Sequence, residues 1–121
     1  MGSSGKVFEI EVEGGTLIVV PLGDSLGFQE SQIVVGINKL HQRIEDPVIN
    51  HLVVDLSGAT YLGSIIISAL MTLAVKVRDT GGHAVICNAS EAMYDIIKIT
   101  RLDVVLPYYE TRGEAMASLT E

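Results

Sequence analysis

Residues 52–70 read LVVDLSGATYLGSIIISAL, and this stretch decides which fold the chain is expected to adopt. The run His51–Leu56 is short, apolar and rich in valine, which is typical of a strand buried on both faces. A turn is expected around Ser57–Gly58. Ser64 suits the N-cap position of a helix that extends to about Asp79. A buried strand joined to a long helix predicts an α/β domain.

Upstream of this stretch, the sequence predicts a hairpin and a helix. Apolar residues and glutamates alternate along Val7–Glu13, which is typical of a half-exposed edge strand. Gly14–Gly15 forms the expected hairpin turn, and Thr16–Val20 is a second, more apolar strand. A helix is predicted from about Gln29 to Ile44. Its single apolar stripe consists of Ile33, Ile37, Leu40 and Ile44.

Downstream, strands and helices continue to alternate. Gly81–Gly82 ends the long helix, and His83–Cys87 reads as the next strand. A helix is expected from Ser90 through Ile99, followed by a short strand at Val104–Leu106 and an amphipathic helix at Arg112–Leu119. The predicted order is therefore ββαβαβαβα. Strand–helix–strand crossovers of this length imply parallel pairing from the third strand onward.

The length and composition indicate one globular domain. The chain has 121 residues, of which 48% are hydrophobic and 19% are charged, so it can bury a core and is not disordered. With two Phe, four Tyr and no Trp, that core is expected to be aliphatic. We expect residues 1–5 to be a flexible leader or a cloning remnant, and residues 6–121 to form the domain.

The charge balance disfavours two classes of partner. Eight Lys and Arg against fifteen Asp and Glu give a formal charge of −7, which does not suit nucleic acid or an anionic membrane surface. No apolar run reaches the roughly 20 residues that a membrane span needs. Cys87 is the single cysteine and cannot form an intramolecular disulfide. These features fit a reducing compartment and predict a cytoplasmic location.

The candidate catalytic residues do not combine into a recognisable active site. Cys87 lies in an apolar predicted strand, where a buried structural thiol is usual. His41, His51 and His83 show no metal-ligand spacing. Asp55 ends a strand, as the phosphorylated aspartate of receiver domains does, but the acidic pair and the lysine of those domains are missing. We expect Asp55 to hold the following turn through backbone amides. The sequence therefore predicts no enzyme, no metal and no cofactor.

The stretch quoted above resembles the STAS family, the domains of anti-sigma-factor antagonists and of sulphate-transporter tails. Asp55–Ser57 (DLS) and Tyr61–Leu62 match that family in residue type and spacing. Gly23–Asp24 stands where the family has G-E-L-D. The order of elements fits over most of the chain. The resemblance implies a STAS-like single α/β domain, with a mixed, mostly parallel sheet and helices packed against it.

The chain departs from the family at the phosphorylation motif. Where relatives have D-S-S-G or D-S-T-G, this chain has Gly63–Ile66 (GSII), so Ile65 replaces the hydroxyl that a partner kinase phosphorylates in sigma-factor antagonists. Ser64 remains as a candidate phosphoacceptor, although an N-cap role is the simpler interpretation. Ile65 shares the water-facing side of the predicted helix with Ser68. It either forms a permanent docking surface or is tucked under the preceding loop.

The resemblance implies a regulator that works by binding other proteins. The implied partner is an anti-sigma factor of the serine-kinase type, or a related signalling protein, in a bacterial partner-switching system that controls transcription. The implied contact residues are Asp24, Gly63, Ser64, Ile65 and Ser68. Two alternatives stay open. The same helix start could serve a scaffold or homodimer, or the domain could bind a small ligand or lipid.

Overall fold

The computed structural model describes residues 7–22 and 30–119, and these form a five-stranded sheet in the order β1-β2-β3-β4-β5. β1 and β2 are antiparallel, and each later strand runs parallel to its neighbour. The mixed, mostly parallel sheet expected from the sequence is therefore confirmed. The strands are β1 (Phe8–Glu13), β2 (Thr16–Pro21), β3 (His51–Asp55), β4 (Ala84–Cys87) and β5 (Tyr108–Tyr109).

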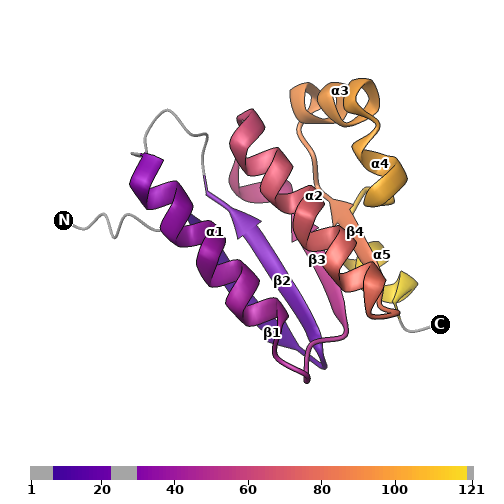
Figure 1. The fold of residues 1–121 in the computed structure, drawn as a ribbon. Coiled ribbons are helices and arrows are strands. Elements are labelled where there is room, and N and C mark those ends of the chain that lie inside the picture. Colours follow the sequence, from indigo (N-terminus) through magenta and orange to yellow (C-terminus); the bar gives the residue numbers. More distant parts are fainter. Residues whose placement is uncertain (1–6, 23–29, 120–121) are drawn as a thin grey trace.

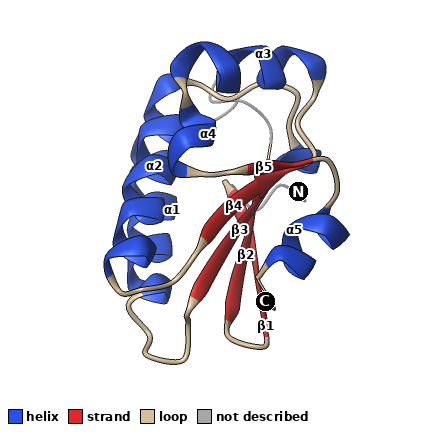
Figure 2. Ribbon diagram, turned by 90° about the vertical axis from the view of Figure 1, so that its right-hand side faces the viewer, coloured by secondary structure: helices blue, strands red, loops and turns tan. Residues whose placement is uncertain are grey.

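Helices cover both faces of the sheet. α1 and α2 pack side by side on one face, and α5 lies on the other (Figure 1; Figure 2). α3 lies beyond one end of the strands, at the top of both views. The helices are α1 (Glu30–Ile44), α2 (Ser64–Asp79), α3 (Glu91–Thr100), α4 (Leu102–Val105) and α5 (Arg112–Ser118), with a 3₁₀ turn η2 (Leu56–Gly58) between β3 and α2.

Two apolar clusters fill the space between these layers. Successive residues of β2 alternate between the clusters, because neighbouring side chains of a strand point to opposite faces. Leu17 and Val19 join the larger cluster, which also contains the buried side chains of α1 and α2, whereas Ile18 and Val20 join the smaller cluster with Ala115 of α5. The buried row of α2 matches the predicted core-facing row. It consists of Ile66, Leu70, Leu73 and Val77.

The predicted strand at Val104–Leu106 is wrong. The chain forms the short helix α4 there, and the last strand, β5, is Tyr108–Tyr109. Arg101 adopts a left-handed conformation with φ of 59°, which ends α3 and starts α4. Leu102 and Leu106 are then one helical turn apart, and both are buried. Periodicity cannot separate a strand from one helical turn in so short an apolar run.

Two histidines stack where β3 and β4 begin. The ring centroids of His51 and His83 are 5.5 Å apart, and the His83 backbone N–H donates to His51 Nδ1 at 3.0 Å. Burial lowers the pKa of His51, and the neighbouring His83 lowers it further. The folded protein is therefore more stable with His51 neutral than with His51 charged.

We predict that His51 makes folding less favourable in mild acid. Because its folded-state pKa lies below the ordinary 6.5, its contribution to stability is complete above pH 6.5 and is lost as pH falls through the folded pKa. Protonation of Nδ1 also removes the acceptor for the His83 N–H. Urea unfolding at several pH values between about 5 and 7.5 should show a shallower decline for His51→Gln than for the unchanged protein. Equal slopes would contradict the assignment.

Candidate partner-binding surface

The segment that leads to α2 is held by a buried carboxylate at the end of β3. Asp55 is 2% exposed, and its Oδ1 accepts the Ser57 N–H at 2.9 Å. The predicted role of Asp55 in holding the turn is confirmed. Oδ1 also accepts from Asn88 Nδ2 at 3.0 Å, and Oδ2 accepts from Arg112 Nε at 2.8 Å. One side chain thus ties η2 to the loop after β4 and to the start of α5.

The charge on Asp55 is balanced by these contacts. Burial by itself raises the pKa of the Asp55 carboxyl, but the hydrogen bonds from Ser57, Asn88 and Arg112 outweigh burial and bring the pKa below its ordinary value. Arg112 also forms a second ion pair, in which its NH1 lies 3.3 Å from Glu11 Oε1. Asp55 is therefore an ionised structural group with a counter-ion.

Cys87 lies beside Asp55 in the sheet and is fully buried. Burial raises the pKa of the Cys87 thiol to about 12, and the nearby Asp55 charge contributes to the rise. The thiolate is the reactive form of cysteine, so this side chain is inert near neutral pH. The predicted structural role of Cys87 is confirmed.

The loop between η2 and α2 is fixed by α3. The Ser90 hydroxyl donates to the Thr60 carbonyl at 2.8 Å, and the Leu62 N–H points to the sulfur of Met93 at 3.3 Å. Leu62 is buried, whereas Tyr61 beside it is half exposed. The loop therefore presents an aromatic side chain to solvent while two contacts hold its backbone against α3. Tyr61 was predicted only as part of the motif, and its exposure depends on packing against α3.

The prediction that Ser64 caps α2 is wrong. Gly63 is the N-cap, with an extended backbone (φ −77°, ψ 169°), and its carbonyl accepts the Ile67 N–H at 3.1 Å. Ser64 is already the first helical residue, so its hydroxyl has no capping role. By contrast, Ser90, at which the next helix was expected to start, caps α3 and accepts the Met93 N–H at 3.1 Å. The N-terminal amides of α2 thus have no side-chain cap.

Ile65 is half exposed, with 49% of its surface accessible. The alternative in which Ile65 is tucked under the preceding loop is therefore wrong. Ser64 and Ser68 are also exposed, and Gly63 is partly buried. Asp24, the fifth predicted contact residue, lies outside the described residues. We refer to the solvent-facing group at this end of α2 as the α2 N-terminal surface. It consists of Tyr61, Gly63, Ser64, Ile65 and Ser68.

The α2 N-terminal surface lies in a long uncharged segment. No Asp, Glu, Lys or Arg occurs between Asp55 and Lys76, although the whole chain carries 23 such residues, eight basic and fifteen acidic. The exposed groups of this surface are a phenol, two hydroxyls and an aliphatic side chain. Such a surface can exclude water from a contact without first desolvating a charge.

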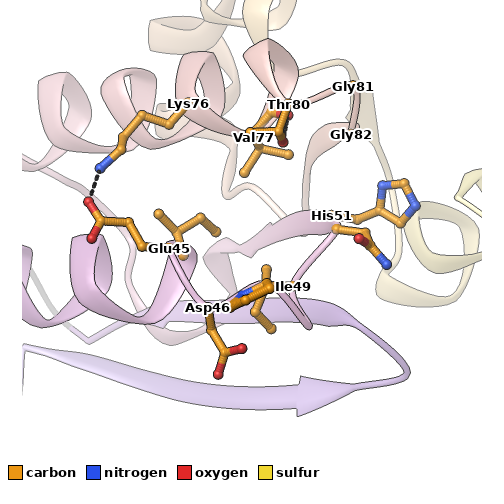
Figure 3. Close-up of a pocket in the computed structure, with 12 residues that line it drawn as sticks. Glu45, Asp46, Ile49, His51, Lys76, Val77, Thr80, Gly81 and Gly82 are labelled. Atoms are coloured by element: carbon orange, nitrogen blue, oxygen red, sulfur yellow. Dashed lines mark hydrogen bonds and ion pairs between the residues drawn. The ribbon is translucent and has the colours of Figure 1, made fainter.

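A separate pocket of about 680 Å³ lies at the other end of α2 (Figure 3). Its lining includes Ile49 in the turn before β3, Lys76 near the end of α2 and His51 at the start of β3. The Lys76 ammonium donates to Glu45 Oε2 at 3.1 Å, and His51 Nδ1 is already bonded to the His83 N–H. Because these polar groups pair with protein atoms, they do not converge on the empty space. The geometry gives little support to a small-ligand site.

The described residues contain neither a metal-binding cluster nor a membrane-spanning helix. Within residues 7–22 and 30–119, no group of three or more His, Cys, Asp and Glu side chains could hold a metal ion. In that same part of the chain, none of the helices is long and apolar enough to cross a bilayer.

The fold and the motif define a known class of domain. The STAS domain family matches residues 8–115, so this chain belongs to the STAS family. The resemblance drawn from Asp55–Ser57 and Tyr61–Leu62 is thereby confirmed. A comparison with curated proteins found no match.

Solved structures share the fold at low sequence identity. An anti-sigma factor antagonist from Mycobacterium paratuberculosis is 21% identical, with complete coverage of both chains and a TM-score of 0.78. A STAS domain protein from Planctomyces limnophilus is 17% identical over 94% of this chain and 98% of its own, with a TM-score of 0.78. The Bacillus protein SpoIIAA in its phosphorylated form is 14% identical, covering 92% of this chain and 97% of its own, with a TM-score of 0.69.

Proposed function

We propose that this STAS domain is an anti-sigma factor antagonist that binds its partner constitutively, without regulation by phosphorylation. The observation that carries the proposal is the half-exposed Ile65, at the start of α2, where antagonists have a modifiable hydroxyl. SpoIIAA, which shares the fold, has been solved in both unphosphorylated and phosphorylated forms. Isoleucine cannot accept a phosphoryl group, so the same position here stays apolar.

The physical effect of this replacement follows from its place on the helix. A phosphate at a helix N-terminus is favoured by the free backbone amides and by the helix dipole. Such a group would place about two negative charges on the α2 N-terminal surface and would disrupt an apolar contact. Ile65 keeps the surface neutral. Binding would then depend on the amounts of the two proteins or on an upstream partner.

The proposed mechanism is competition and needs no catalysis. The partner is an anti-sigma factor of the serine-kinase type, whose contact with the α2 N-terminal surface prevents it from holding a sigma factor. The rigid loop before α2 supports this role, because Thr60 and Leu62 are fixed to α3 and little conformational entropy is lost on binding. The proposal places the protein in the bacterial cytoplasm, as a regulator of transcription.

We predict that Ile65→Asp weakens partner binding by about 100-fold, because a buried charge replaces an apolar anchor at the centre of the contact. Isothermal titration against serine-kinase-type anti-sigma factors from the source organism would measure the change. Val48→Asp is the matched control, since Val48 is 63% exposed and lies in the turn before β3, at the other end of the domain. If both variants bind as the unchanged protein does, the proposed surface is wrong.

The same complex tests whether binding is permanent. Incubated with ATP and its kinase partner, the protein is expected to remain bound and unmodified, as judged by mass spectrometry of the intact chain and of its peptides. Phosphate on Ser64 together with release of the partner would overturn permanent binding. That result would instead assign the switch to the first residue of α2.

A further inference from the structure

The α2 N-terminal surface is too small to be a complete contact between two proteins. It has five residues, whereas a stable interface involves roughly 20–30 residues on each side. A partner that binds there must therefore also cover a neighbouring part of the domain. The neighbours are α3, the rest of α2, and α1, which packs beside α2 on the same face of the sheet (Figure 1).

The first half of α1 presents an uncharged side to solvent. Four exposed residues follow the i, i+3, i+4, i+7 spacing of one side of a helix. We refer to them as the α1 face, which consists of Ser31, Val34, Val35 and Asn38. Val34 and Val35 keep 47% and 54% of their surface accessible, compared with 49% for Ile65. The charged residues Glu30 and Lys39 limit the face at its two ends.

Two contacts fix the register of α1 against α2. The Lys76 ammonium, on α2, lies 3.1 Å from His41 Nδ1 and 3.1 Å from Glu45 Oε2, both on α1. The two helices also run in the same direction, because each connects strands that are parallel to each other. Positions along one helix can therefore be matched to positions along the other.

This register places Val34 beside Ile65. Eleven residues make about three full turns, so two positions that are each eleven residues earlier lie on the same sides of their helices. Counting back eleven residues from Glu45 and Lys76 gives Val34 and Ile65. The exposed aliphatic groups of the two helices are thus neighbours, and the α1 face continues the α2 N-terminal surface without an intervening element.

The exposed valines are not explained by the fold. The core side of α1 is formed by other residues, Ile33, Leu40 and Ile44. Valine is also a poorer helix former than alanine or lysine, because its branched side chain loses rotamer freedom in a helix. Exposed aliphatic groups that lie together, unlike single ones, mark a surface that another protein covers.

The other neighbours of the α2 N-terminal surface suit an apolar contact less well. The exposed positions of α3 include Glu91, Asp95 and Lys98, and covering them would require desolvating charges. Along α2, the next exposed aliphatic residue after Ile65 is Val75, ten residues or about 15 Å away. Only α1 brings an exposed aliphatic group directly beside Ile65.

We infer that the partner covers the starts of both helices, with Val34 and Ile65 as a paired aliphatic contact. This inference rests on the proposed function, because its occupant is the same anti-sigma factor, and it adds α1 to the contact. The partner's matching surface is apolar, since a charge there would be buried without a counter-ion. The α1 face thereby contributes to the choice among related partners as well as to affinity.

We predict that Val34→Asp weakens binding of this anti-sigma factor by about 10-fold or more, since the contact would bury the new charge. Isothermal titration measures the change, and circular dichroism verifies folding. Val75→Asp is the matched control, because Val75 is 45% exposed on the same helix pair, and it should change the affinity by less than about 2-fold. Unchanged binding of Val34→Asp would overturn the inference, as would a loss for Val75→Asp alone.

Val34→Lys tests whether burial or long-range charge causes the loss. Both charged variants of Val34 should bind weakly, because a contact that covers this position desolvates either charge. If Val34→Asp binds weakly and Val34→Lys binds as well as the unchanged protein or better, the cause is repulsion by an acidic partner at a distance. That result would also overturn the inference.

Protection of an introduced thiol gives a readout that does not depend on affinity. Val34→Cys should react with a maleimide at least about 10-fold more slowly when the anti-sigma factor is saturating, as followed by mass spectrometry of this chain. Val48→Cys, in the turn before β3, should react equally fast in both states. The native Cys87 is buried and does not interfere. Equal reactivity of Val34→Cys with and without the partner would contradict the inference.

The variants separate this inference from the proposed function. If Ile65→Asp weakens binding and Val34→Asp does not, the inference is wrong and the proposed function stands. If neither variant weakens binding, the α2 N-terminal surface is not the contact, and both are wrong. A loss for each variant, with Val34→Cys protected, supports both.

Discussion

Replacing Arg112 by methionine is expected to lower the free energy of unfolding by about 3 kcal/mol, since it leaves Asp55 charged and buried without a counter-ion. The Asp55 side chain is 3% exposed and that of Arg112 is 34% exposed, with 2.8 Å between Arg112 Nε and Asp55 Oδ2. The expected loss lies at the lower end of the range for broken buried pairs, because Arg112 remains partly in water. Urea unfolding at pH 7 measures it.

Two further variants test whether the lost ion pair causes this destabilisation. Glu11→Gln removes the exposed carboxylate 3.3 Å from Arg112 and should lower the free energy of unfolding by less than about 1 kcal/mol. Adding Asp55→Asn to Arg112→Met removes the unpaired charge and should restore part of the stability, while keeping an oxygen for the Ser57 N–H. If Arg112→Met costs no more than Glu11→Gln, the ion pair does not fix α5 to the sheet.

The pH dependence offers a second readout of the same pair. The folded-state pKa of Asp55 is below 3.8, so its contribution to stability is present above pH 3.8 and is lost as pH falls through the folded pKa. Without Arg112 the folded-state pKa of Asp55 rises. The difference in stability between Arg112→Met and the unchanged protein should therefore shrink in acid.

Gly82→Ala is expected to destabilise the fold by about 3 kcal/mol or more. An added Cβ would lie 1.8 Å from the Asn50 carbonyl oxygen and 2.9 Å from Val77 Cγ1. The Gly82 N–H also donates to the Val77 carbonyl at 3.0 Å, which closes the C-terminus of α2. Because the nearest atom belongs to the backbone, the turn and the start of β3 must both shift.

Gly113→Ala is the matched control for this prediction. An added Cβ there would lie 3.9 Å from Thr111 Oγ1, and Gly113 is inside α5. Alanine is a better helix former than glycine, so this variant should be stabilised by about 0.5–1 kcal/mol. Thermal unfolding of both variants would separate the two effects. A Gly82→Ala protein as stable as the unchanged one would show that the turn is not closely packed.

The positions of the elements could be predicted because they depend on local patterns. The alternation of glutamates in β1, the apolar run of β3 and the row of Ile66 and Leu70 in α2 each repeat with the period of their own element. The same periodicity placed Ile65 on the water-facing side of α2. The bond from Asp55 to the Ser57 N–H is also local, since the two residues are two positions apart.

Other features could not be predicted, because they depend on distant parts of the chain. Asp55 and Arg112 are 57 residues apart, and no local pattern links them. Gly63 instead of Ser64 caps α2 because the loop before it is fixed by α3, which sets where helical geometry begins. α4 replaced the predicted strand because packing buries Leu102 and Leu106 together.

Apart from α4 and β5, the sequence by itself therefore determined which helices and strands form, in what order, and which side of each is apolar. It also determined that Ile65 follows Ser64 at the start of α2, and the proposed loss of a modifiable hydroxyl rests on that sequence. Only the tertiary structure decided that Ile65 is exposed beside a loop held by α3, and that Arg112 balances a buried charge. The physical reason is that side-chain period is a property of neighbouring residues, whereas burial and charge pairing depend on which distant surfaces meet.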